Sequence, residues 1–133
     1  MWIFLNNAFL SIVSDKENPS NLLVRARRDG DIQRVFPRAR AWTTPTSDYR
    51  YRASVPRAYV AKVLALQIEK IDYTNLKDSV TDESRHIVYV QVWRQMFIWQ
   101  GVMVEKLGPV ASPPVTAKKP RRKRWPLFGG RAR

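Results

Sequence analysis

Residues 49–71, YRYRASVPRAYVAKVLALQIEKI, decide the fold, because their hydrophobic repeat changes from that of a strand to that of a helix at a single proline. Up to residue 55 apolar side chains alternate with Arg50, Arg52 and Ser54, which is typical of a half-buried strand. Pro56 suits the first position of a helix, where its missing N–H costs nothing. The residues that then recur at helical spacing are Val60, Val63, Leu64, Gln67, Ile68 and Ile71. We therefore expect a strand over residues 49–55, with Tyr49 on its apolar face, and a helix over residues 56–71.

Further strands are predicted upstream. Residues 22–28, LLVRARR, alternate between an apolar face and a face that carries Arg25 and Arg27. The two short apolar runs 2–6 and 9–13 flank an Asn pair that suits a tight turn, so they form either a hairpin or one bulged strand. Residues 38–48 are an irregular connection with a short strand at 39–43.

Two more helices are predicted. A short one over residues 32–36 is capped by Asp29 or Asp31 and stopped by a proline. A long one over residues 82–100 begins with acids in its first turn, which favours the helix dipole. Its apolar stripe, which we expect to be core, consists of Tyr89, Val92, Trp93, Met96 and Trp99.

These elements predict the α+β class, with an antiparallel sheet of about four strands and two main helices packed on one face. A chain of 133 residues can bury a core in one domain. From residue 108 the composition shifts to proline and small residues and then to lysine and arginine, which cannot form a core. We expect a compact domain over residues 1–107 and a disordered, basic, proline-rich tail over residues 108–133.

The net charge is the strongest global feature. The chain carries 24 Lys and Arg against 11 Asp and Glu, a formal charge of +13 at pH 7. Eight cations and no acid lie in residues 118–133, which leaves 16 cations against 11 acids, or +5, elsewhere. A polyanionic partner, DNA or RNA, is the natural inference. No apolar run reaches the roughly 18 residues of a spanning helix, so no transmembrane segment is expected.

The basic tail is the first candidate binding site. A flexible cationic segment neutralises phosphates and releases counterions, and a neighbouring tryptophan stacks on unpaired bases. The alternatives are a solubilising tail, a nuclear-localisation-like address, and a membrane anchor beside anionic lipid. The residues assigned to nucleic-acid binding here are Lys118, Lys119, Arg121, Arg122, Lys123, Arg124 and Trp125.

The second candidate is an arginine face made by Arg25, Arg27, Arg50 and Arg52, provided that their two strands are neighbours in one sheet. Guanidinium groups in a row suit phosphates or an acidic protein surface, because each offers planar, bidentate donors. The alternative is an ordinary solvated sheet face whose charges only oppose edge pairing.

No catalytic constellation is present. The chain has no cysteine, so thiolate catalysis and cysteine metal sites are excluded. His86 is the only histidine, and we expect it to be an exposed helix residue rather than an acid–base group. Residues 29–31, DGD, are too short for a calcium loop. The loop 72–77, DYTNLK, is favoured as a helix stop and re-cap. We expect no enzyme, no metal and no cofactor.

A set of short motifs resembles a family of small uncharacterised proteins encoded by bacteria, prophages and mobile elements. The resemblance covers roughly residues 1–100 and implies a compact fold in a bacterial or phage setting, with no assigned activity. The motifs are Trp2-x-Phe4, Phe9-x-Ser11-x-Val13, Leu23-Val24-Arg25-Ala26-Arg27, Asp48-Tyr49-x-Tyr51-Arg52-Ala53 and Asp72-Tyr73-x-Asn75-Leu76-Lys77.

Taken together, these features predict a non-enzymatic binding protein from a phage or mobile element that engages nucleic acid or a nucleoprotein complex through basic surfaces. Inhibition of host defence machinery would fit that setting. The expected location is the cytoplasm of the bacterial or infected host cell, in association with the nucleoid. The alternative is a protein–protein or membrane-surface adaptor, in which the folded domain recognises the partner and the tail only anchors the complex.

Overall fold

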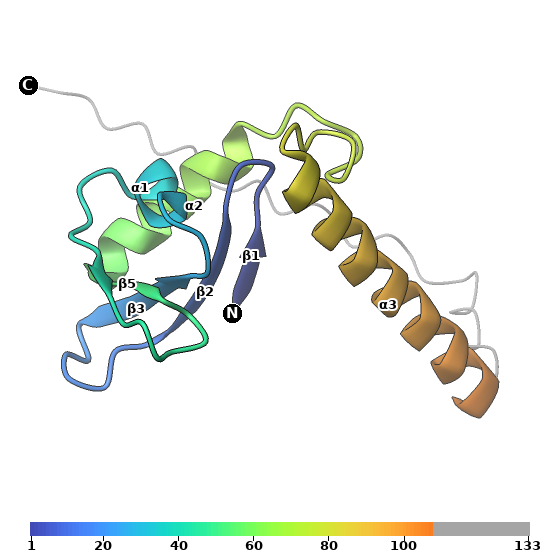
Figure 1. Cartoon of the computed structure of the whole chain (residues 1–133), viewed down its shortest axis with the longest axis horizontal. Helices are drawn as coiled ribbons and strands as arrows, with labels where there is room; N and C mark the ends of the chain where they lie inside the picture. The colour runs from blue at the N-terminus through green and yellow to red at the C-terminus, as the bar shows by residue number, and fades with distance from the viewer. Residues whose placement is uncertain (108–133) are drawn as a thin grey trace, which may run out of the picture. The chain divides into compact units, whose positions relative to one another are not determined.

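The computed structural model of this chain describes residues 1–107 (Figure 1). The tail predicted over residues 108–133, with all the basic residues assigned to it, lies outside the described residues. The contacts divide the chain into two units, Met1–Met96 and Phe97–Arg133. The fold and the sites described below belong to the first unit, and the described part of the second is helical.

The first unit is an antiparallel sheet with helices, so the predicted α+β class is confirmed. Five strands form the sheet: β1 (Trp2–Phe4), β2 (Phe9–Ser14), β3 (Asn21–Ala26), β4 (Trp42–Thr43) and β5 (Tyr51–Pro56). Three helices are described: α1 (Asp31–Val35), α2 (Arg57–Glu69) and α3 (Glu83–Leu107). The order across the sheet is β1-β2-β3-β5-β4, and every neighbouring pair is antiparallel.

The two apolar runs at the N-terminus form a hairpin rather than one bulged strand. Phe4 pairs with Phe9, and the Leu5 amide donates to the Ala8 carbonyl at 2.8 Å to close the turn. The condition set for the arginine face is also met, because β3 and β5 are neighbours over their whole length.

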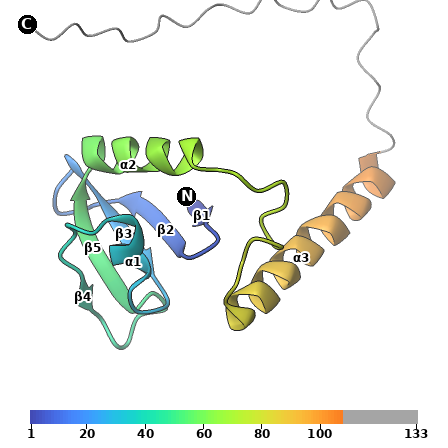
Figure 2. The ribbon, with the colours of Figure 1, turned by 90° about the horizontal axis from the view of Figure 1, so that it is seen from above.

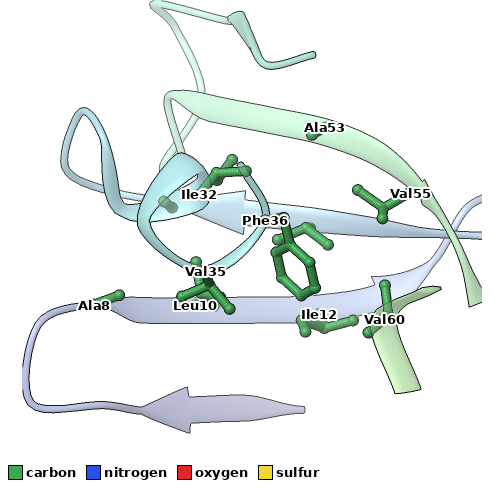
Figure 3. Packing of buried hydrophobic residues seen from close by; sticks show 11 residues of the cluster. Ala8, Leu10, Ile12, Ile32, Val35, Phe36, Ala53, Val55 and Val60 are labelled. Atoms are coloured by element: carbon green, nitrogen blue, oxygen red, sulfur yellow. The ribbon is translucent and has the colours of Figure 1, made fainter. Parts of the chain in front are cut away.

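The core lies on one face of the sheet, between the strands and the helices α1 and α2 (Figure 2). Phe36, which follows α1 and is fully buried, packs among strand side chains such as Leu10 and Val55 (Figure 3). The alternation of apolar residues expected for residues 22–28 holds, since Val24 and Ala26 are fully buried. The opposite, outer face of the sheet is therefore left to carry polar and aromatic side chains.

The apolar stripe of α2 is only partly buried. Val60 is 2% exposed and belongs to the core, and Val63 and Leu64 pack against it. Ile68 and Ile71, which the helical spacing assigned to the same stripe, are exposed. The core contacts of α2 therefore come from Val60, Val63 and Leu64, and the apolar residues at the end of the repeat stay exposed.

The stripe predicted as core on α3 differs in the same way. Tyr89 is 5% exposed, and Val92 is half-buried, whereas Trp93 and Met96 are more than half exposed. Trp93 contacts the Lys77 ammonium, which lies 4.9 Å from the centre of its ring. Burial in this helix follows Arg85 and Tyr89, one turn apart, rather than the expected stripe.

The sequence suggested Asp29 or Asp31 as the cap of α1, but Asp31 does not cap this helix. Gly30 is the N-cap residue, and as a glycine it has no side chain that could cap the helix. Its φ of 78° is a left-handed conformation that suits glycine. Asp31 is the first helical residue, and its side chain is 1% exposed. The carboxylate is therefore free of a capping role and takes part in a buried ion cluster described below.

Candidate nucleic-acid interface

A row of five residues crosses the outer face of the sheet in register, one from each strand. Residues that are directly opposite in an antiparallel pair project from the same face. The pairings are Trp2 with Ser11, Ser11 with Arg25, Arg25 with Arg52, and Arg52 with Trp42. We call Trp2, Ser11, Arg25, Arg52 and Trp42 the Trp–Arg row. Two adjacent guanidinium groups thus lie between two tryptophans, which are 62% and 46% exposed.

Arg25 occupies the centre of the row and is half-buried. Its Nη2 donates to the Ser11 hydroxyl at 2.8 Å, and its Cζ lies 4.6 Å from the centre of the Tyr49 ring. Its Nε is buried and has no hydrogen-bond partner among the described residues. A buried donor without an acceptor costs free energy, so this side chain is held in place at some cost to stability.

Arg52 is positioned by the loop before β5. Its Nε donates to the Tyr49 carbonyl at 3.2 Å, and its Nη2 donates to the Ser47 hydroxyl. These acceptors are neutral, and no salt bridge to Arg52 is found among the described residues. Trp42, from the edge strand β4, pairs with it in register.

The other two residues of the predicted arginine face lie beyond the row. Arg27 follows β3, donates to the Asp48 carbonyl at 3.0 Å, and has its Cζ 4.3 Å from the centre of the Tyr49 ring. Tyr49 was expected on the core face, but it precedes β5 and its buried ring contacts the arginines instead. Arg50 also precedes β5 and is exposed. The structure thus brings Arg25 and Arg52 together, joins Arg27 to them through Tyr49, and leaves Arg50 outside the strand.

A groove of about 560 Å³ runs beside the row. The sheet residues that line it include Leu23, Arg25, Arg52 and Trp42, and the turn after β2 lines it as well. That turn contributes Asp15, a buried carboxylate that accepts hydrogen bonds from the Ser54 hydroxyl and the Glu17 amide. These two bonds lower the pKa of Asp15. The groove lining therefore combines the cationic and aromatic side chains of the row with Asp15, Lys16 and Glu17 of the turn.

A second hollow, of about 380 Å³, lies at the other end of the outer face. Aromatic side chains of the hairpin line it, with Phe4 and Phe9 in contact at 4.8 Å between ring centres. The start of α3 contributes Tyr89, whose ring meets Phe4 edge-on at 5.0 Å. Arg27 and Tyr49 line this hollow as well, so they connect the two ends of the outer face.

The beginning of α3 is held by a buried ion cluster that the sequence did not reveal. Arg85 donates through Nη2 and Nη1 to the two Asp31 oxygens at 2.8 and 3.1 Å, and Arg34 donates to Oδ1 at 2.7 Å. The Phe9 amide donates to Oδ2 at 3.0 Å. Burial lowers the pKa of Arg85, whereas the hydrogen bonds to Asp31 and its negative charge raise the pKa by a larger amount. The pKa is raised overall, so the guanidinium stays charged.

Tyr89 fixes the same helix to the hairpin turn. Its hydroxyl lies 3.0 and 2.9 Å from the carbonyl oxygens of Leu5 and Ala8, to which it donates. Burial raises the pKa of the phenol, so it remains a donor at neutral pH. An arginine and a tyrosine four residues apart on a predicted helix were the only sequence signal for this contact, because such residues share one helix face.

The candidate metal and acid–base residues of the sequence have ordinary structural contacts. No group of three or more His, Asp or Glu is arranged to hold a metal ion within residues 1–102. His86 is half-buried, and its Nδ1 lies 2.8 Å from the Lys77 carbonyl, which ties the 72–77 loop to α3. Asn75 accepts from the Lys77 amide at 3.1 Å within that loop, as in a local Asx turn. Among the described helices, none is long and apolar enough to cross a membrane.

No protein-family model, curated protein or solved structure matches this chain. The resemblance to the family of small bacterial and prophage proteins therefore stays a prediction, and the function must be argued from the residues.

Proposed function

We propose that this chain is a non-enzymatic binding protein that engages nucleic acid, alone or in a nucleoprotein complex, through the Trp–Arg row and the predicted basic tail. The observation that carries the proposal is the register that sets Arg25 opposite Arg52, with a tryptophan at each end of the row. In a phage or mobile-element setting, such a protein would act as an inhibitor of a host defence nucleoprotein.

Unpaired strands suit this surface better than a duplex. Sheet faces that bind single-stranded nucleic acid stack bases on exposed rings while cations neutralise the backbone. Trp2 and Trp42 offer exposed rings, and Arg25 and Arg52 offer planar donors that match phosphate oxygens. A duplex presents its phosphates but not the faces of its bases, so it would use only the cations.

The predicted tail adds a term that does not depend on sequence. Residues 118–124 carry six cations in seven positions, and each phosphate that they neutralise releases counterions. We expect the tail to raise the affinity for every polyanion and the Trp–Arg row to provide the preference for unpaired strands.

The experiment compares two double variants of the full-length protein. Arg25→Gln/Arg52→Gln removes the guanidinium pair, and Arg38→Gln/Arg40→Gln removes two exposed arginines outside the row at the same cost in charge. Binding to labelled single-stranded RNA and DNA is measured by anisotropy, with circular dichroism as the check on folding.

The first variant is expected to weaken binding to single strands by at least about tenfold, since each charge-assisted contact contributes roughly 1.5–3 kcal/mol. The Arg38/Arg40 control should change it by less than about twofold to threefold, the effect of charge at a distance. Equal losses in the two folded variants would refute a role for the row.

A second candidate is a protein–protein or membrane-surface adaptor, which is favoured by apolar side chains on α3. Ile87 and Val88 are each 51% exposed, and Met96 is 56% exposed. Exposed apolar side chains on one helix are typical of a surface that binds a protein or a membrane. Binding of a protein partner should survive the loss of Arg25 and Arg52. Binding to anionic vesicles that is lost on deletion of residues 118–133 would favour the membrane form.

A further inference from the structure

The hollow between the hairpin and α3 has the make-up of a small-molecule site. Its volume of about 380 Å³ falls at the lower end of the roughly 300–1,000 Å³ found for ligand pockets. Phe4, Phe9 and Trp2 line it on the hairpin side, and Val88 and Val92 line it on the α3 side. A lining of this kind removes apolar surface from water and favours flat, apolar groups. The size admits one or two rings rather than a long chain.

One side of the hollow is cationic. Arg27, Arg28 and Arg85 all line it, and Asp31 is the only carboxylate among the lining residues. Asp31 is already used on both oxygens, since Arg85 binds Oδ1 and Oδ2, Arg34 binds Oδ1, and the Phe9 amide binds Oδ2. The carboxylate therefore offsets the charge of the cluster, and Asp82 pairs with Arg28 at 3.0 Å, so Arg27 is the lining arginine for which the described residues provide no ion pair.

Arg27 and Arg28 retain donors for a ligand. The printed sequence places them side by side after β3, and both are exposed. Among the described residues, Arg27 donates through Nη1 to the Asp48 carbonyl, and Arg28 donates through Nη1 to Asp82 and Ser84. A guanidinium has five N–H donors in a planar fork, so Nη2 and Nε of each side chain remain for an anion.

We propose that this hollow binds a small aromatic molecule that carries one anionic group. The rings lie against Phe4 and Phe9, and the anion lies against the guanidinium groups of Arg27 and Arg28. A neutral apolar ligand would leave the cationic side without a partner, and a hydrophilic anion would leave the aromatic wall in water. The site shares Trp2 with the Trp–Arg row but lacks Arg25, Arg52 and Trp42, so variants of those three residues test the nucleic-acid function without changing the hollow.

The test uses anilinonaphthalene sulfonate, a fluorescent aromatic anion, and its uncharged analogue phenylnaphthylamine, titrated into the full-length protein. Val88→Trp fills the hollow, and Ile87→Trp is its matched control, because both residues are 51% exposed and only Val88 lines the site. Arg27→Gln removes the cation, with Arg38→Gln as the control outside the site.

The proposal expects one sulfonate per chain, and a loss of at least about tenfold in affinity for Val88→Trp with little change for Ile87→Trp. Arg27→Gln should weaken the binding of the sulfonate by at least about fivefold, as expected for the loss of one charge-assisted contact. The affinity for the uncharged probe should stay unchanged. Several sulfonates per chain, or equal losses in Val88→Trp and Ile87→Trp, would overturn the site.

Two sources of such a ligand are then separated by displacement of the bound sulfonate. Displacement by adenosine monophosphate identifies a nucleotide, and displacement by naphthoate without displacement by the nucleotide identifies an aromatic acid. Either result supports the proposal, and displacement by neither overturns the assignment of the ligand class.

Discussion

Asp31 holds its negative charge in almost complete burial, at 1% side-chain exposure, and the fold depends on how that charge is balanced. An ionised carboxylate removed from water is costly unless every oxygen is paired. Arg85 supplies two of the bonds from a side chain that is itself only 5% exposed, and Arg34 supplies one from a side chain that is 48% exposed. The two arginines therefore contribute unequally to stability.

Arg85→Ala is expected to lower the free energy of unfolding by about 3–5 kcal/mol, because it leaves the buried carboxylate without its main partner. Arg34→Ala should lower it by only about 0–1 kcal/mol, as for an exposed ion pair. Urea unfolding followed by tryptophan fluorescence measures both. Equal destabilisation by the two variants would show that Arg34 and Arg85 contribute alike to balancing the charge, contrary to this expectation.

Trp42 is the residue whose role in binding separates most cleanly from its role in folding, since it is 46% exposed on the two-residue edge strand β4. Trp42→Ala should weaken the binding of single-stranded RNA by about 1–3 kcal/mol, which is the contribution of one stacked base. Trp42→Phe should restore most of the affinity. If the alanine variant binds as tightly as the natural protein, Trp42 is an edge residue without a stacking role.

At the scale of elements, the first turn of α3 is capped by Asp82. The Ser84 hydroxyl, the Arg85 amide and the Arg28 guanidinium lower the pKa of Asp82 well below its ordinary value of 3.8. The folded pKa of Asp82 lies below its unfolded pKa. The ionised carboxylate therefore stabilises the capped helix in full at any pH above the unfolded pKa. Its contribution is lost as the pH falls through the folded pKa.

Acidification from about pH 5 towards pH 2, across the ordinary Asp range, is therefore expected to lower the protection of the amides in the first turn of α3, measured as their exchange relative to the unfolded chain at the same pH. Asp82→Asn should remove this pH dependence, since the amide does not titrate in this range. Asp15→Asn is the matched control, because Asp15 also has a lowered pKa but lies in the turn after β2. Persistence of the dependence in Asp82→Asn would assign it to another group.

Local sequence patterns predicted the elements better than their partners. The period-two alternation of residues 22–28 and the change of repeat at Pro56 correspond to β3, β5 and α2, because these signals depend only on neighbouring residues. The burial of α3 did not follow its apolar stripe. Among the described residues, the buried side chains of α3 are Arg85 and Tyr89, because these two contact Asp31 and the hairpin turn. Both partners lie more than 50 positions away in the sequence, so no local pattern indicates them.

The candidate site shows the same division. Alternation put Arg25 and Arg52 on one face of their strands, but the row required the pairing order β1-β2-β3-β5-β4, which no local pattern encodes. Trp2 and Trp42 joined it only through that order. Tyr49 was misplaced because the strand begins two residues later than its alternation suggested.

At the scale of the whole molecule, two surfaces are proposed to bind nucleic acid, the Trp–Arg row and the predicted basic tail. The salt dependence of binding distinguishes their contributions. The affinity of a polyanion falls with salt in proportion to the phosphates neutralised, with a log–log slope of roughly 0.7 for each contact on a single strand. We expect the predicted tail to contribute most of this slope, because it carries most of the cations proposed to meet phosphates. The Trp–Arg row contributes a smaller share, which is visible as a difference between variants.

The most direct measurement is the salt slope for binding of a single-stranded oligonucleotide to the full-length protein, Arg25→Gln/Arg52→Gln and Arg38→Gln/Arg40→Gln. If each arginine of the row neutralises one phosphate, the first variant should have a slope smaller by about 1.4, while the control keeps the natural slope. An unchanged slope in a folded Arg25→Gln/Arg52→Gln variant would contradict the account, because it would leave the sheet face without contact to the nucleic acid.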